Sequence, residues 1–121
     1  MEEANKDLIR RMIKRVDAEG ETAYADFVVP DVIWHASEIV EDVKAAFTNL
    51  KHTIEEMIAE DDKLAVRFTA RAVNTGEFMN ISPSGKEVAF TVLGIYRIAD
   101  GMVVEGWFEF DTLGLIEQIK E

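Results

Sequence analysis

The side chains of this sequence best suited to acid–base chemistry are a histidine, an aspartate and a tyrosine. His35 follows Trp34 at the end of a short apolar run, and an imidazole can donate or accept a proton near neutral pH. Asp111 follows the last apolar run, and an apolar cavity would make its carboxylate more basic. An aspartate directly before a helical pattern is also a typical N-cap. Tyr96 could donate a hydrogen bond to a ligand carbonyl. The candidate catalytic residues are therefore His35, Asp111 and Tyr96.

Metal and cofactor chemistry are not expected. The chain has no cysteine, and its two histidines, His35 and His52, have no neighbouring ligand at a spacing typical of metal sites. His52 begins an expected strand near the surface and is a weaker acid–base candidate than His35. We therefore expect neither a metal ion nor a cofactor.

Charge and length narrow the class of protein further. The 13 Lys and Arg against 24 Asp and Glu give a net charge of −11, which repels nucleic acids and anionic membranes. The acidic start Met1-Glu2-Glu3 is unlike a signal peptide, and no apolar run approaches the ~20 residues of a membrane helix. With 121 residues, 48% of them hydrophobic, the sequence predicts one cytoplasmic domain over residues 1–121.

The elements that must position these residues follow from apolar periodicity and turn signals. Helices are expected over residues 4–16 and 22–28, from Ser37 to about Leu50, and over 112–120. A short strand is expected over residues 32–35, and longer strands over 53–60, 63–75, 87–99 and 102–110. Helices against one face of an antiparallel meander make an α+β fold.

Apolar residues occupy mainly the even positions of the last three strands, so even positions should face inward. Together with Trp34, the following residues are the expected substrate-binding set: Phe68, Phe90, Val92, Gly94, Gly106, Phe108 and Phe110. The two glycines would leave room for a ligand. The aromatic side chains could instead fill the space as ordinary core.

The assignment depends on the hairpin at Asp100-Gly101. A two-residue turn would pair Ala99 with Met102 and bring Glu105 and Glu109 to the inner face, giving an acidic pocket. A three-residue loop with a left-handed Gly101 would keep even residues opposite even ones. We favour the three-residue loop, because it buries the phenylalanines and leaves the glutamates in water or near an arginine.

The odd positions would then form an outer face that mixes three arginines with apolar side chains. These residues are Arg67, Arg71, Arg97, Leu93, Ile95 and Trp107. Such a composition is typical of protein interfaces. The sequence therefore predicts a homodimer through the outer sheet face.

Four segments of the chain resemble the SnoaL-like family of the nuclear transport factor 2-like superfamily. They are IAEDDKLAVRFT over 58–69, NTGEFMNISPSGK over 74–86, ADGMVVEGW over 99–107 and DTLGL over 111–115. The resemblance implies a cone-shaped curved antiparallel sheet packed against three N-terminal helices, with a short C-terminal helix. It also implies a deep pocket and, often, a homodimer. Members close polyketide rings by cofactor-free aldol chemistry with a carboxylate acid–base, and relatives isomerise ketosteroids or only bind ligands.

Three positions of this chain differ from the family pattern. Gly106 and Asn74 stand where the family often has histidine, and Phe108 lies where the cyclases tend to place their catalytic acid. The sequence therefore favours a non-catalytic domain that binds a hydrophobic small molecule. The alternative is a cofactor-free cyclase or isomerase for a ketone-bearing, polyketide- or steroid-like substrate, with His35 or Asp111 as base and Tyr96 as donor.

Overall fold

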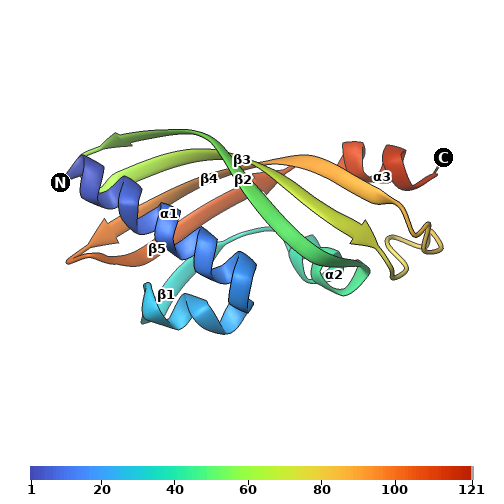
Figure 1. Ribbon diagram of the computed structural model, residues 1–121, viewed down its shortest axis with the longest axis horizontal. Helices are drawn as coiled ribbons and strands as arrows, with labels where there is room; N and C mark the ends of the chain where they lie inside the picture. Colours follow the sequence, from blue (N-terminus) through green and yellow to red (C-terminus); the bar gives the residue numbers. More distant parts are fainter. Residues whose placement is uncertain (121) are drawn as a thin grey trace.

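The structure is a computed structural model that describes residues 1–120 (Figure 1). Helical segments and a first strand come before a run of long strands that follow one another directly. The elements in chain order are α1 (Glu2–Glu19), the 3₁₀ helix η1 (Glu21–Asp26), β1 (Val28–His35), α2 (Ile39–Ala46), β2 (Phe47–Glu60), β3 (Lys63–Asn74), β4 (Glu87–Ala99), β5 (Met102–Phe110) and α3 (Thr112–Lys120). The expected α+β class is confirmed. None of the described helices is long and apolar enough to cross a bilayer.

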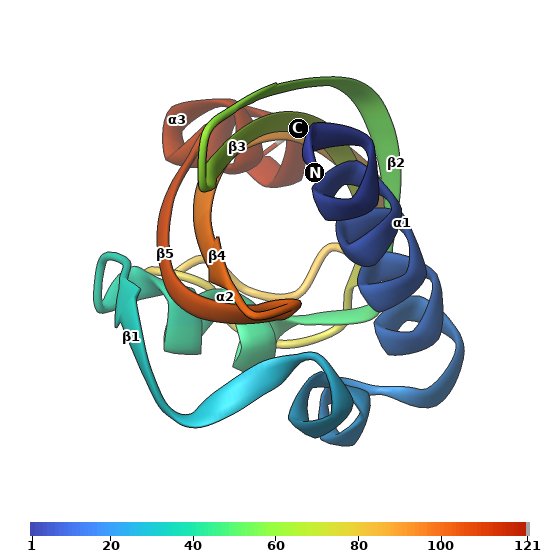
Figure 2. The ribbon, with the colours of Figure 1, turned by 90° about the vertical axis from the view of Figure 1, so that its left-hand side faces the viewer.

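The sheet has five strands in the order β1-β5-β4-β3-β2. Strands β2 to β5 pair antiparallel with their neighbours, whereas β1 pairs parallel with β5. The sheet curves strongly, and α1 lies along its concave side (Figure 2). This curvature gives the sheet an inner face toward α1 and an outer face away from it.

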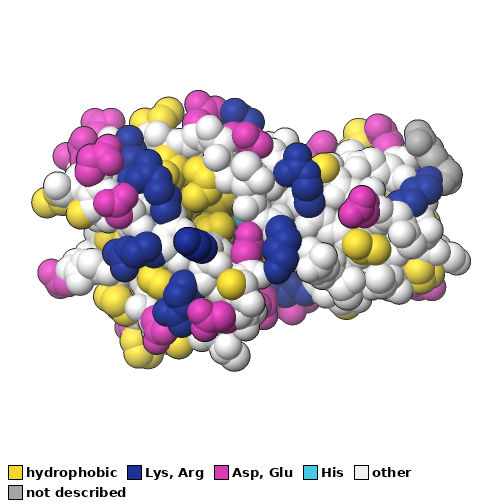
Figure 3. Space-filling model, in the orientation of Figure 1, with side chains coloured by type: hydrophobic (Ala, Val, Ile, Leu, Met, Phe, Trp, Pro, Cys, Tyr) yellow, Lys and Arg dark blue, Asp and Glu magenta, His cyan; other side chains and the backbone are white. Residues whose placement is uncertain are grey.

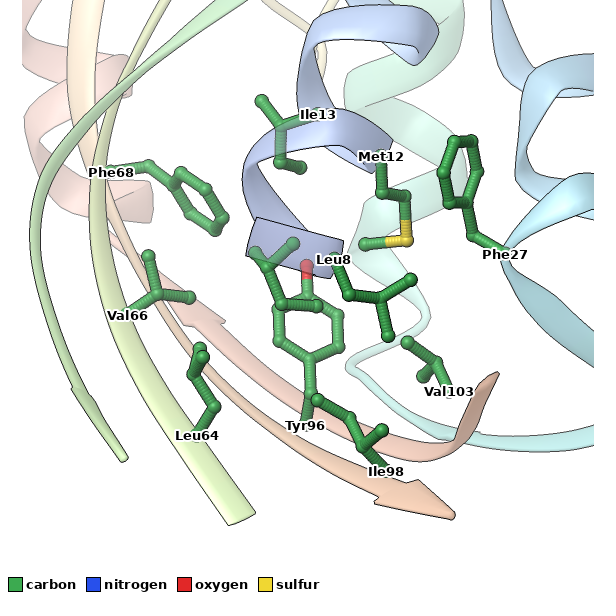
Figure 4. Close-up of a cluster of buried hydrophobic side chains, with 11 residues drawn as sticks. Leu8, Met12, Ile13, Phe27, Leu64, Val66, Phe68, Tyr96, Ile98 and Val103 are labelled. Atoms are coloured by element: carbon green, nitrogen blue, oxygen red, sulfur yellow. The ribbon is translucent and has the colours of Figure 1, made fainter. Parts of the chain in front are cut away.

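The interior of the fold consists of two hydrophobic clusters. The first lies between α1, the even residues of β3 and β4, and Val103 of β5, and Figure 4 shows the Tyr96 ring among its aliphatic side chains. The second gathers residues of α2, α3 and the other ends of β3 and β4 around Phe78 and Phe90. Burial of even positions in β3 confirms the predicted alternation, since Leu64, Val66 and Phe68 are all buried.

Two N-terminal elements differ from the prediction. The expected helix over 22–28 is the shorter η1, because the chain makes three-residue hydrogen bonds such as Phe27 N–H to Tyr24 O, and β1 then begins at Val28. The helix expected from Ser37 to about Leu50 ends at Ala46, where β2 begins. Phe47 pairs with Asn74 of β3 there, so pairing in the sheet overrides helical periodicity.

The last hairpin has a two-residue turn, so the predicted three-residue loop is wrong. Asp100 and Gly101 have φ of 51° and 74°, and Ala99 pairs with Met102. The predicted inward placement of Gly106 and Phe108 is nevertheless correct, because a bulge at Val104 takes up one residue, whereas before the bulge the buried residue of β5 is the odd Val103. From that point on, even residues again lie opposite even ones, and Gly94 pairs with Phe108.

Candidate functional site

Four aromatic side chains meet on the inner side of the sheet, and we call them the aromatic cluster: Tyr24 of η1, Trp34 of β1, Tyr96 of β4 and Phe108 of β5. The Trp34 ring centroid lies 6.2 Å from that of Tyr24, 6.5 Å from that of Tyr96 and 5.5 Å from that of Phe108. Tyr96 and Phe108 make an edge contact at 5.4 Å. The cluster thus brings together three predicted site residues and adds Tyr24.

Two strand glycines make this packing possible. A Cβ atom at Gly106 would lie 2.6 Å from the Trp34 ring, and one at Gly94 would lie 3.1 Å from the Phe108 ring. The space that these glycines leave is therefore occupied by Trp34 and Phe108 in this structure. Trp34 is 40% exposed and belongs to the edge strand β1, so its ring covers the cluster from the solvent side.

The titratable groups of the aromatic cluster are two phenols. Burial raises the pKa of Tyr24 to about 12, with smaller contributions from Glu21 and Asp17. Burial also raises the pKa of Tyr96 well above its usual value, and Tyr24 adds to this effect. Both hydroxyls therefore stay protonated at neutral pH and can donate hydrogen bonds to a ligand oxygen.

His35 lies on the outer side of the sheet, at the end of β1. Its Nε2 lies 2.7 Å from Oε2 of Glu105, and its ring stacks on Trp107 with centroids 5.1 Å apart. The other carboxylate oxygen of Glu105 accepts a hydrogen bond from Arg97 Nε at 3.0 Å. The hydrogen bond with His35, followed by that from Arg97, lowers the pKa of Glu105. His35 and Tyr96 therefore lie on opposite sides of the sheet.

A groove of about 480 Å³ runs along the outer face beside His35. Its apolar surface includes Ile58, Leu93 and Ile95, which are 66%, 53% and 43% exposed. An ion pair between Arg67 and Glu56, at 2.9 Å, lies at its edge. The groove is thus an apolar surface bordered by both signs of charge.

Asp111 caps the C-terminal helix. Its Oδ1 accepts a hydrogen bond from the Gly114 N–H at 2.9 Å, and its main-chain oxygen accepts one from Leu115 N–H. These contacts confirm the N-cap interpretation. The carboxylate is directed to the helix end rather than to the aromatic cluster.

The other predicted binding residues do not line one pocket. Phe68 packs in the first hydrophobic cluster, whereas Phe90 and Phe110 belong with the second, and Val92 contacts both. Phe68 and Phe90 are only 2% and 7% exposed. In this structure they pack as core side chains.

Asn74, one of the positions where the family often has histidine, holds the loop between β3 and β4. It is fully buried, its Nδ2 donates to the Gly76 carbonyl at 2.9 Å, and its Oδ1 accepts from the N–H and hydroxyl of Ser84. All of these partners belong to the protein. Asn74 therefore stabilises the loop and leaves no amide atom for a ligand.

Sequence reasoning missed two participants. Tyr24 was placed within a short helix, and nothing in its surroundings marked it as a neighbour of Tyr96. Glu105 lies beside Arg97, as expected, but its contact with His35 was not expected, because it depends on the parallel pairing of β1 with β5. Among residues 1–120, no group of three or more His, Asp or Glu side chains is arranged to hold a metal ion.

Comparisons with known proteins agree on the fold. The family model of the SnoaL-like polyketide cyclases matches residues 6–119. The AclR protein of Streptomyces galilaeus superposes with a TM-score of 0.85 at 25% identity, covering 99% of this chain and 83% of that one. The IdmH protein of Streptomyces antibioticus gives 0.81 at 21% identity, covering 96% and 98%. A SnoaL-like polyketide cyclase of Agrobacterium tumefaciens gives 0.77 at 16% identity, covering 93% and 95%. None of the curated protein sequences matches the chain.

Proposed function

Because the chain belongs to the SnoaL-like polyketide cyclase family, we propose that it binds a hydrophobic, carbonyl-bearing small molecule at the aromatic cluster and does not transform it. The ligand would take the place of the Trp34 indole against Phe108. The Tyr24 and Tyr96 hydroxyls would donate hydrogen bonds to its oxygen. Apolar contact supplies most of the affinity, and the phenols select for a neutral acceptor.

One observation carries this proposal: the two glutamates of β5 and Asp111, which directly follows β5, hold their carboxylates away from the aromatic cluster. Glu105 is bound to His35 and Arg97, Glu109 is exposed, and Asp111 caps α3. Aldol or isomerase chemistry needs a base within hydrogen-bond reach of an acidic C–H. The cluster offers donors without such a base, which supports binding rather than catalysis.

The two tryptophans allow a test that locates the ligand. Trp107→Phe leaves Trp34 as the reporter at the aromatic cluster, and Trp34→Phe leaves Trp107 as the reporter on the outer face. Nile red, a neutral apolar dye with a ring carbonyl, is titrated into both variants. We expect quenching of Trp34 fluorescence and little change at Trp107. Quenching confined to Trp107 would show that the ligand occupies the outer face and would overturn the proposal.

A second pair of variants tests the hydrogen bond. Tyr96→Phe removes one donor and keeps the ring, so Nile red affinity should fall roughly fivefold to tenfold, as expected for one buried hydrogen bond. The matched control is Glu109→Gln on the outer face, which should change affinity less than about twofold. Equal affinity in Tyr96→Phe and the native protein would contradict the assigned role of the phenol.

The alternative function, a cofactor-free cyclase or isomerase, draws on the His35–Glu105 pair. A histidine held by a carboxylate is a common acid–base arrangement, and here it borders the apolar outer groove. Such an enzyme would promote deuterium exchange at the carbon next to a ketone in D₂O, and His35→Ala would abolish it. We expect no exchange above the buffer rate; exchange lost in His35→Ala would establish the alternative.

We also propose that the outer groove is covered by a second copy of this chain. Leu93 and Ile95 of β4 are exposed beside the Arg67–Glu56 ion pair of β3 and β2, and a twofold axis through the groove would bring each charge to its opposite in the partner. Light scattering should give a dimer mass at micromolar concentration, and Leu93→Arg should give a monomer. Leu113→Arg, at an exposed position of α3, is the control. A monomer mass for the native protein would contradict this assembly.

A further inference from the structure

A second groove, of about 440 Å³, lies where α1 crosses β2. Five residues on one side of α1, at spacings of three and four along the helix, line this groove. Three residues of β2 complete its lining. The lining residues are Arg10, Ile13, Lys14, Asp17, Ala18, Lys51, His52 and Ile54. This groove shares no lining residue with the aromatic cluster or with the outer groove, and the function proposed above does not use it.

His52 is fixed in this groove by Asp17. The Asp17 carboxylate binds the His52 main-chain N–H at 2.6 Å and the ring Nδ1 at 2.8 Å. The edge of the His52 ring packs against Phe68, and both His52 and Asp17 side chains are only 16% exposed. Since Nδ1 and both carboxylate oxygens are engaged, Nε2 is the ring atom left for a ligand.

The groove is basic although the chain carries a net charge of −11. Lys51 Nζ donates to the main-chain oxygen of Asp17, and neither Lys51 nor Lys14 forms an ion pair with a carboxylate within residues 1–120. Arg10 is paired with Asp7 at 2.8 Å. Figure 3 shows Lys and Arg side chains gathered on the face that α1 presents. Two ammonium groups outside ion pairs thus line the groove together with the His52–Asp17 pair, whose carboxylate is the negative charge among the lining residues.

We propose that this groove binds the phosphate group of a small molecule. A phosphate dianion matches the charge of Lys14 and Lys51. Because Nδ1 of His52 donates to Asp17, Nε2 donates to the phosphate when the ring carries both protons. Ile13 and Ile54 form an apolar wall that would hold the carbon part of the ligand. The hydrogen bonds between Asp17 and His52 link α1 to β2 whether or not a ligand is bound. They do not explain why Lys14 forms no ion pair within residues 1–120, or why the groove is open.

The probe is inorganic phosphate, titrated into the ¹⁵N-labelled native protein at constant ionic strength. Chloride serves as the salt control and acetate as the control for a simple carboxylate. We expect saturable shifts at the amides of residues 13–18 and 51–54 with phosphate, and no saturation with either control. Phenyl phosphate should produce the same shifts at lower concentration, because its ring adds contact with the apolar wall.

Two charge-reversal variants decide whether the groove causes the effect. Lys14→Glu should weaken phosphate binding by roughly tenfold or more, since an attractive charge becomes a repulsive one. Lys63→Glu, an exposed lysine at the start of β3, changes net charge equally and should weaken it less than about twofold. Lys14→Gln keeps the helix and should fall between them. Equal weakening in Lys14→Glu and Lys63→Glu, shifts scattered over the chain, or tighter binding of acetate would overturn the proposal.

Discussion

The two faces of the curved sheet handle ionisable groups in opposite ways. On the inner face, the Tyr96 phenol is buried among carbon atoms, and burial raises its pKa further above neutral pH. On the outer face, Glu105 is ionised and held by His35 and Arg97. The difference follows from solvation, because a charge costs much more to bury than a phenol that can stay protonated. The inner face therefore suits a neutral ligand, and the outer face suits a charged or mixed partner surface.

The faces should also differ in what they contribute to the stability of the monomer. Phe68 is 2% exposed, so Phe68→Ala should lower the free energy of unfolding by about 3–5 kcal/mol. Leu93 is 53% exposed, so Leu93→Ala should lower it by less than about 1 kcal/mol in the monomer. Urea unfolding at nanomolar protein concentration, below the micromolar range in which the dimer is expected, measures both. Similar losses in the two variants would contradict the division of the sheet into a core face and a surface face.

The contact of Trp34 with Gly106 gives a smaller effect that tests the inner face alone. In Gly106→Ala the added Cβ would lie 2.6 Å from the Trp34 ring, so the ring must move toward solvent. We expect a loss of about 1–3 kcal/mol in the free energy of unfolding. In a Trp107→Phe background, the emission of Trp34 should also shift to longer wavelength.

Gly94→Ala is the matched control for that change. Its Cβ would lie 3.1 Å from the Phe108 ring, which needs to yield by only a few tenths of an ångström. The entropy gained by replacing glycine offsets part of this cost, so stability should change by less than about 1 kcal/mol. An unchanged Trp34 emission in Gly106→Ala would show that the ring does not rest on this glycine.

Residue alternation was sufficient to predict which face of the sheet is buried. The bounds of β4, β5 and α3 were predicted as observed, and the inner placement of Phe108 and Tyr96 follows from a period of two. The hairpin turn was predicted incorrectly. The predicted inner face of β5 is still correct from Gly106 onward, because Val104 forms a bulge. A bulge is set by the packing of neighbouring strands, and the residue types around Val104 carry no signal for it.

The composition of the site was less predictable than the fold. His35 was identified as a candidate, but its partner Glu105 is 70 residues away and is reached through the parallel pairing of β1 with β5. The sequence suggests the meander of β2 to β5 through short turns, whereas no local pattern specifies where the edge strand β1 docks. The contact of Tyr24 with Trp34 depends on the same docking, since β1 places Trp34 beside η1.

The smallest expected effect is a pH dependence that belongs to the outer face. Hydrogen bonds with His35 and Arg97 lower the pKa of Glu105 below its ordinary value of 4.5. Glu105 therefore stabilises the fold fully above pH 4.5, and this contribution is lost as the pH falls through the lowered pKa. The free energy of unfolding of Glu105→Gln, measured by urea titration, should lie below that of the native protein at pH 7 and approach it in acid.

The control for this pH dependence is Glu109→Gln, which removes a charge from the same strand and face. Glu109 is exposed and forms no ion pair with any side chain of residues 1–120. Its stability curve should therefore run parallel to that of the native protein between pH 7 and pH 3. If the two substitutions reduce the dependence of the unfolding free energy on acidic pH equally, Glu105 is stabilised no more than a solvated carboxylate. The contrast between the charged outer face and the neutral inner face then loses its electrostatic basis.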